Sequence, residues 1–262
     1  MSVLLEFHEV AYAYPQLPGL ERRPDALQGI TFQVRQGERL ALLGANGAGK
    51  STLLWMLNGT LKPSSGRVSF AGRPVEYARQ GLHALRRQVV LVTQDPDDQL
   101  FAGSLREDVS FGPMNLGLPP ELVMRRANDA LALMDLGHLA HLPPHQLSQG
   151  QRKRAAIAGA VAMKPRVLVL DEPTAGLDPR SIASLRGVLG TLESQGTTVI
   201  LCTHDIDFAG EWASRALVLQ EGRLCADGGA EEIMGDEALM SRSCLRVPVR
   251  LLLRRGQDLD PC

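Results

Sequence analysis

The chain has 262 residues, 44% of them hydrophobic, which suffices for one large α/β domain with an insertion. Lys and Arg number 28 against 29 Asp and Glu, so the basic excess typical of nucleic-acid binding is missing. No apolar run approaches the roughly 20 residues of a membrane-spanning helix. Residues 1–10 lack the basic region and cleavage site of a signal peptide, and the cysteines form no C-x-x-C pair. We therefore expect a soluble, cytoplasmic protein.

Short apolar runs predict strands along the whole chain. Several are continuous, as expected where helices cover both faces of a parallel sheet. The first three strands, with a turn at Gln36-Gly37-Glu38, predict an antiparallel patch before a glycine-rich loop. Helical periodicity appears over 52–57, 121–136 and 149–163. The predicted strands are 4–7, 30–34, 40–43, 67–70, 89–92, 167–170, 197–202, 216–220 and 223–226.

Residues 44–52 match the phosphate-loop pattern G-x-x-x-x-G-K-[ST] between a predicted strand and a predicted helix. Glycines let backbone N–H groups surround phosphate oxygens, and the helix N-terminus adds about half a positive charge. We expect Lys50 to reach the β- and γ-phosphates and the Ser51 hydroxyl to bind Mg2+. The nucleotide-binding residues predicted here are Gly44, Asn46, Gly47, Ala48, Gly49, Lys50, Ser51 and Thr52.

A second centre follows the apolar run 167–170, which ends in Asp171 and Glu172. The carboxyl ends of the strands are the edge where open α/β sheets bind ligands. Asp171 suits Mg2+ as a hard oxygen donor, and Glu172 is the better candidate to orient and polarise an attacking water. An acidic pair after a strand is weak evidence for a site when taken alone, but its position downstream of a phosphate loop favours nucleotide hydrolysis.

The segment Leu147-Ser148-Gln149-Gly150-Gln151, followed by a basic helical run over 152–158, resembles the signature motif of ABC transporter ATPases. Taken alone, Ser148 would more often be a helix N-cap than a binding residue. The resemblance implies an α/β P-loop NTPase (RecA-like) core with an antiparallel β patch and an inserted α-helical subdomain. It also implies ATP and Mg2+ as ligands, and that residues 148–151 face the γ-phosphate held by a second subunit.

The remaining motifs of that family map onto single residues. Gln94 resembles the glutamine that touches Mg2+ or the water, and Asp178 resembles the aspartate that crosses the dimer interface. His204 resembles the histidine that hydrogen-bonds the γ-phosphate. An aromatic residue that stacks on adenine is expected at Tyr14, with Tyr12 as the competing candidate.

Two positions depart from the commonest family pattern. Gln149 replaces the usual first glycine of the signature, and Gly176 occupies a place where a different small residue is common. If position 149 needs a positive φ, glutamine would be strained there and turnover would change.

The expected organisation is a nucleotide-binding core over 1–93 and 165–228, a helical subdomain over 94–164 and a C-terminal tail over 229–262. No internal repeat is present, so one nucleotide-binding unit is expected. The tail is weakly patterned, and we interpret it as a solvated basic segment, with dimer contacts or lipid headgroups as the alternative. Its arginines are Arg242, Arg246, Arg250, Arg254 and Arg255.

Residues 95–101 and 107–119 resemble the ATPases of energy-coupling-factor importers, most of all their cobalt and nickel branch. The resemblance implies a transmembrane coupling protein, a substrate-binding membrane protein and a second copy of this chain as partners, at the cytoplasmic face of the inner membrane. It implies cobalt uptake, while nickel or a vitamin such as biotin, and pairing with a paralogue, stay open. His138, His141 and His145 are interpreted as loop histidines, not metal ligands.

Two other classes of protein compete with a transporter subunit. A non-transport ABC ATPase that grips a macromolecule usually carries paired cassettes or a long coiled-coil insertion, and this sequence has neither. A P-loop kinase or GTPase leaves the segment 147–151 without a role.

Overall fold

The computed structural model describes residues 2–15 and 25–254, so Arg255 and the rest of the predicted tail beyond it lie outside the described residues. The chain forms two compact units, one from residues up to 85 and from 200 onward, the other from 86–199. The helical subdomain expected over 94–164 falls within the second unit, which also contains the strands and helix that flank it in sequence.

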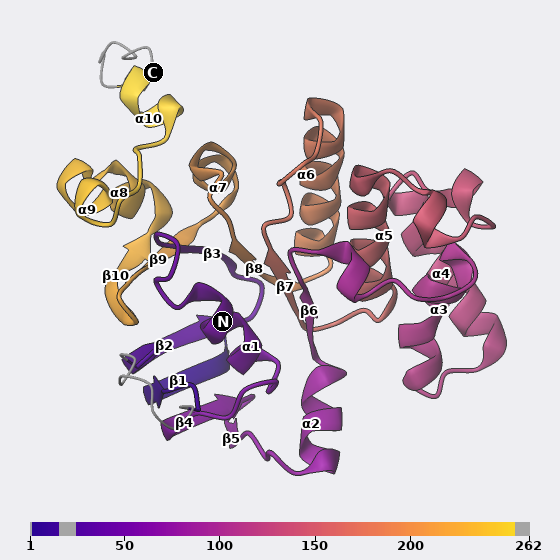
Figure 1. Cartoon of the computed structure of the whole chain (residues 1–262), viewed down its shortest axis with the longest axis horizontal. Helices are drawn as coiled ribbons and strands as arrows, with labels where there is room; N and C mark the ends of the chain where they lie inside the picture. The colour runs from indigo at the N-terminus through magenta and orange to yellow at the C-terminus, as the bar shows by residue number, and fades with distance from the viewer. Residues whose placement is uncertain (1, 16–24, 255–262) are drawn as a thin grey trace. The chain divides into compact units, whose positions relative to one another are not determined.

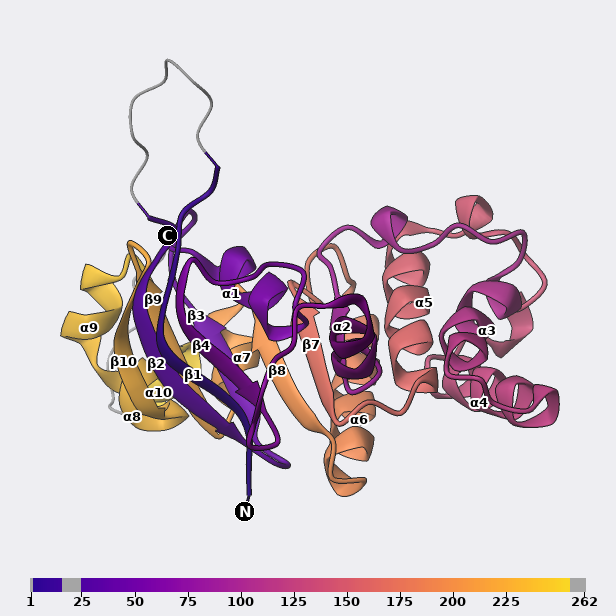
Figure 2. The same ribbon diagram turned by 90° about the horizontal axis from the view of Figure 1, so that it is seen from below.

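An antiparallel sheet of the first unit has the strand order β2-β1-β4-β5 (Figure 1), and Figure 2 shows β2, β1 and β4 next to one another from below. Buried and exposed residues alternate along β2, so one face of that strand packs on the core. The expected antiparallel patch is therefore present. The predicted third strand is also a strand, but its predicted membership of this patch was wrong, because residues 39–43 pair in parallel with β9 elsewhere in this unit. The bounds are β1 (Val3–Tyr12), β2 (Leu27–Arg35), β4 (Ser65–Phe70) and β5 (Arg73–Pro74).

The other strands of the first unit carry the phosphate loop. β3 (Arg39–Leu43) is almost wholly buried and runs parallel to β9 (Arg215–Gln220), and β10 (Arg223–Gly229) pairs antiparallel with β9. The loop after β3 leads directly into α1 (Lys50–Leu57). The first unit also contains α2 (Arg79–Arg86), whose last residue belongs to the second unit, and α7 (Ile206–Trp212), which follows β8 (Thr198–Cys202).

The described part of the C-terminal tail is folded. Its three short helices are α8 (Ala230–Gly235), α9 (Glu237–Arg242) and α10 (Val249–Arg254). Met234, Met240 and Leu251 are buried in one cluster with residues of β3 and α7. Two of its arginines make ion pairs, Arg246 with Asp207 at 2.6 Å and Arg254 with Glu231 at 2.8 Å. This packing differs from the solvated tail that the sequence predicted.

The second unit places three helices together beside a pair of parallel strands (Figure 1). β6 (Val89–Val92) pairs in register with β7 (Val167–Asp171), so both strands end at the same edge. The packed helices are α3 (Leu105–Asn115), α4 (Pro120–Leu133) and α5 (Gln149–Ala162), and α6 (Pro179–Ser194) follows β7. Short 3-10 turns lie at Pro96–Asp98, Gly137–Leu139 and Pro144–Gln146. Within the described residues, no helix combines the length and the apolar character needed to cross a bilayer.

Candidate functional site

The phosphate loop is shaped by three glycines with left-handed backbones, Gly44 (φ 151), Gly47 (φ 79) and Gly49 (φ 101). A Cβ atom on Gly44 would lie 2.4 Å from the carbonyl oxygen of Leu219, and one on Gly49 would lie 2.5 Å from that of Ala26. Both positions therefore require glycine for space as well as for conformation.

Lys50 begins helix α1 directly after this loop and is only 8% exposed. Its ammonium group donates to the carbonyl oxygens of Gly44 at 2.7 Å and Ala45 at 2.9 Å. These two bonds use two of its three donors and hold the charge at the loop. Asn46, Gly47 and Ser51 are exposed, Ala48 and Thr52 are buried, and the start of α1 adds its partial positive charge.

Tyr14 lies beside the phosphate loop. Its hydroxyl oxygen is 3.0 Å from Oγ1 of Thr52, and its ring meets that of Tyr12 edge to face with centroids 5.0 Å apart. The Tyr14 side chain is 43% exposed. Tyr12 is partly buried, and this burial raises the pKa of its hydroxyl above the ordinary value. The Tyr14 ring is therefore accessible next to the phosphate loop.

His204 follows β8 in the first unit and is exposed. Its carbonyl oxygen accepts the backbone N–H of Ile206, and Asp205 caps α7 by accepting the N–H of Phe208 at 3.0 Å. The side chain of His204 is therefore presented by a short, well-anchored turn.

In the second unit, Asp171 is the last residue of β7 and Glu172 follows it. Glu172 is 8% exposed and has a left-handed φ of 47. This conformation costs a residue with a Cβ about 1–2 kcal/mol. Such strain persists only where the surrounding structure enforces it, and it is concentrated at functional sites.

Gln94 is exposed two residues beyond β6. The turn that presents it is held by Gln99, whose amide accepts the backbone N–H of Thr93 at 3.2 Å and donates to the carbonyl of Leu91 at 3.0 Å. No sequence pattern indicates that Gln99 has this supporting role, because glutamine is an ordinary residue in a polar turn.

The signature segment forms the N-terminus of α5. Ser148 and Gln151 make a capping box, in which Gln151 N–H donates to Ser148 Oγ at 3.3 Å and Ser148 N–H to Gln151 Oε1 at 2.8 Å. Gln149 is the first helical residue and does not have a positive φ. The strain that a positive φ would have imposed on Gln149 is therefore absent.

The two departures from the family pattern lie next to each other. Gly176 has a φ of 74, and a Cβ atom placed on it would be 3.5 Å from Oε1 of Gln149. A Cβ on Gly150 would likewise lie 3.4 Å from Leu177. The start of α5 thus packs against the segment that follows Glu172.

Asp178 is the N-cap of α6 and accepts the backbone N–H and the hydroxyl of Ser181 at 2.8 and 3.1 Å. The bond from the Ser181 N–H is the main reason that the pKa of Asp178 is lowered. Within one chain this residue therefore has a structural role that the family resemblance did not include.

Two basic residues of α5 make contacts that the sequence did not reveal. Lys153 is 4% exposed and binds the carbonyl oxygens of Glu172 and Ala175. Nε of Arg152 lies 2.8 Å from Oδ1 of Asp97 in the turn after Gln94. His138, His141 and His145 are exposed, and the described residues contain no cluster of three or more potential metal ligands.

The phosphate loop and the acidic end of a buried parallel strand together define a P-loop NTPase. The family described as ABC transporter matches residues 27–175. Cobalt import ATP-binding protein CbiO of Rhodobacter capsulatus is 46% identical over 98% of this chain and 91% of its own length. Energy-coupling factor transporter ATP-binding protein EcfA of Methanothermobacter thermautotrophicus is 44% identical over 94% of this chain and 77% of its own.

Solved structures agree with these relatives. The structure of cbiO1 from Clostridium perfringens, described as part of the complex cbiONQ, has a TM-score of 0.80 at 40% identity and covers 97% of this chain and 100% of that one. The dimeric cassette MJ0796 bound to ADP and Pi has a TM-score of 0.79 at 26% identity, over 87% of this chain and 99% of its own. The chain belongs to the ABC transporter ATP-binding family, and it is an ATPase of the kind that powers transport.

Proposed function

We propose that this chain is the ATP-hydrolysing subunit of an energy-coupling-factor importer and that the imported substrate is Co2+. The observation that carries the first part is the retention of both half-sites in one chain, the phosphate loop with Lys50 and the signature with Ser148. The names of the CbiO and EcfA relatives, which align along almost the whole chain, support the cargo and the class of importer.

The proposed catalytic unit is a dimer of two copies at the cytoplasmic face of the inner membrane. ATP binds Lys50 and Ser51 of one copy, and the start of α5 in the other copy, with Ser148 and Gly150, completes the site. Because one chain carries every reactive residue, a symmetric pair has two working sites.

The residues that follow β7 and β8 supply the proposed catalytic chemistry. Glu172 orients and polarises the attacking water, and His204 hydrogen-bonds the γ-phosphate. Charge that develops on the phosphoryl oxygens is stabilised by Lys50 and by the backbone N–H groups of the phosphate loop and the signature. Tyr14 stacks on the adenine, and Asp178 lies at the contact between copies.

The donor set fits Mg2+. Ser51, Gln94 and Asp171 offer a hydroxyl, an amide and a carboxylate oxygen, the hard ligands that this cation prefers, and Ser51 and Gln94 are exposed. When bound, Mg2+ neutralises charge on the β- and γ-phosphate oxygens.

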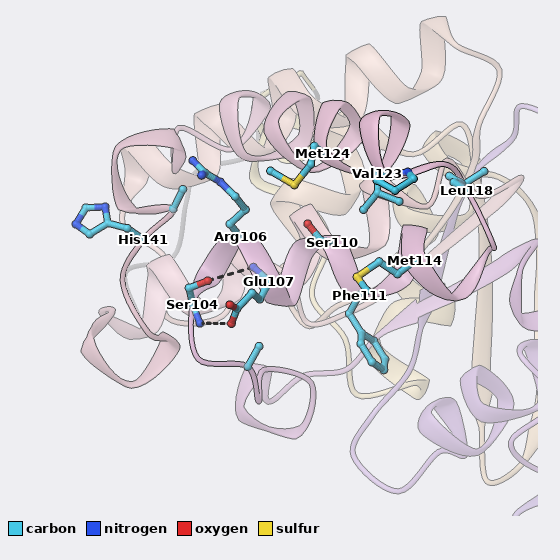
Figure 3. Close-up of a pocket in the computed structure, with 13 residues that line it drawn as sticks. Ser104, Arg106, Glu107, Ser110, Phe111, Met114, Leu118, Val123, Met124 and His141 are labelled. Atoms are coloured by element: carbon cyan, nitrogen blue, oxygen red, sulfur yellow. Dashed lines mark hydrogen bonds between the residues drawn. The ribbon is translucent and has the colours of Figure 1, made fainter.

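A groove between α3 and α4 is the proposed docking site for the coupling protein (Figure 3). It has a volume of 840 Å3, and apolar side chains from both helices line it, with Arg106, Glu107 and His141 at one end. Phe111 and Met114 are 48% and 61% exposed. Exposed apolar patches of this kind mark interaction sites, and a grooved one suits the apolar face of a partner helix.

The groove contacts the segment that follows Gln94 through Phe101 and Ala102. Phe101 packs edge to face on Phe111, with ring centroids 4.8 Å apart. The carboxylate of Asp108 accepts the N–H groups of Phe101 and Ala102 at 3.0 and 3.1 Å, and burial raises the pKa of Asp108. A movement of the turn would therefore reach a docked helix directly.

Uptake of radiolabelled cobalt and nickel by cells with the complete importer tests the cargo. Cobalt accumulation that disappears with Lys50→Ala is the expected result, since Lys50 carries the phosphate-binding charge. Uptake of nickel alone would reassign the metal, and uptake of neither metal would favour a vitamin such as biotin.

A further inference from the structure

The side chain of Lys153 crosses from the signature helix to the loop that carries Glu172. Lys153 lies in the second turn of α5, and its ammonium donates to the carbonyl oxygen of Glu172 at 2.5 Å and to that of Ala175 at 3.0 Å. The side chain is 4% exposed, and burial lowers its pKa against the opposing attraction of Glu172, Asp171 and Asp95.

The two acceptors are the ends of one tight turn. The N–H of Ala175 donates to the Glu172 carbonyl at 3.3 Å, and the N–H of Leu177 donates to the Thr174 carbonyl at 3.1 Å. Glu172 enters this turn with its left-handed backbone, which sets the direction of both its carbonyl and its side chain. A cation bound to both carbonyls therefore stabilises the conformation in which Glu172 is strained.

A second contact joins the same two segments. The side chain of Gln149, one helical turn before Lys153, lies against Gly176 immediately beyond the turn. Residues 149 and 153 are four apart on α5 and therefore share one helix face. That face therefore contacts the 172–176 segment at two points, through the side-chain amide of Gln149 and through the ammonium of Lys153.

We propose that Lys153 is a positioning residue for the water-activating carboxylate. It holds the 172–175 turn closed, which fixes Glu172 at the geometry that in-line attack needs. The inference rests on the proposed role of Glu172. Misplacement of a reacting group by about 1 Å costs on the order of a hundredfold in rate, so loosening this turn acts on turnover and not on nucleotide binding.

Steady-state ATPase kinetics of the purified full-length chain test the proposal with Lys153→Met, which keeps the length of the side chain but removes its donors. We expect kcat to fall about tenfold to a hundredfold, with KM for ATP changed by less than about threefold, because no ATP-binding group is lost. Lys164→Met is the matched control, since Lys164 is an exposed lysine just after the same helix, and its kcat should stay at the wild-type value.

Two further variants separate the possible failures. Lys153→Arg keeps donors at this position and should recover part of the kcat that Lys153→Met loses. Glu172→Gln should abolish turnover; if it does not, the proposed role of Glu172 is wrong. Loss of turnover in Glu172→Gln with wild-type kcat in Lys153→Met would overturn the positioning role alone. Failure of both Lys153 variants to fold, seen as loss of the thermal transition, would also overturn it and assign Lys153 to folding.

Discussion

The glycines of the phosphate loop allow a matched comparison of strain with steric overlap. Gly47 and Gly49 both have left-handed backbones, so alanine at either position costs about 1–2 kcal/mol. A Cβ atom at Gly49 would lie 2.5 Å from the Ala26 oxygen and 3.0 Å from the Leu27 side chain, whereas one at Gly47 meets nothing within 4 Å. Overpacking of this kind adds about 1–3 kcal/mol, so Gly49→Ala should be the more destabilising change.

Thermal unfolding without nucleotide measures this difference and keeps effects on ATP binding out of the comparison. One kcal/mol lowers Tm by about 2–4 °C in a protein of this size, so we expect a fall of about 4 °C for Gly47→Ala and about 10 °C for Gly49→Ala. Equal shifts in the two variants would refute the argument that the carbonyl of Ala26 excludes a side chain at position 49.

Three further predictions follow from single contacts. Asp178→Ala should lower Tm at pH 7, whereas Asp178→Ser keeps a cap. Because the hydrogen bonds from Ser181 hold the pKa of Asp178 below its ordinary value, the difference in Tm between Asp178→Ala and wild type should shrink as the pH falls through that lowered pKa. Arg215→Met should lower the free energy of unfolding by about 1–2 kcal/mol, because it leaves the carboxylates of Asp227 and Glu38 without their ion-pair partner. The loss should be the same from pH 6 to pH 9, because those carboxylates raise the pKa of Arg215 and the arginine stays charged over this range. Phe111→Glu should abolish co-purification with the coupling protein and leave the basal ATPase activity intact. Leu253→Glu, at an exposed apolar residue outside the groove, is the control and should change neither the co-purification nor the ATPase activity.

Features encoded by short segments were predictable from the sequence. The strand over 89–92 has the predicted bounds, and the helix over 149–163 ends within one residue of α5. Local apolar runs and a Ser-x-x-Gln cap suffice for these assignments. Helix α3 was not identified, because Gly112 and Pro113 interrupt its pattern, although Pro113 and the capping box at Ser104 coexist in one helix. The tail helices were missed because each has only six residues.

Features that depend on tertiary contacts were not predictable. Lys153 stands in a run of three basic residues, which by pattern resembles a solvated helix face, and only packing shows that it is buried on two carbonyls. Whether Gln149 is strained depends on its backbone conformation, which the sequence does not specify. Gln149 is helical and has no positive φ, so the strain is absent. The capping role of Asp178 was predictable from its local sequence, but the family resemblance led us to assign it only to the contact between subunits.

Hydrolysis of ATP by Glu172→Gln is the most direct test of the central assignment. The substitution removes the carboxylate and keeps the shape of the side chain. We expect steady-state ATPase to be lost while size-exclusion chromatography with ATP shows a stable dimer, because nucleotide still binds Lys50 and the signature. Steady-state turnover at the wild-type rate would contradict the account.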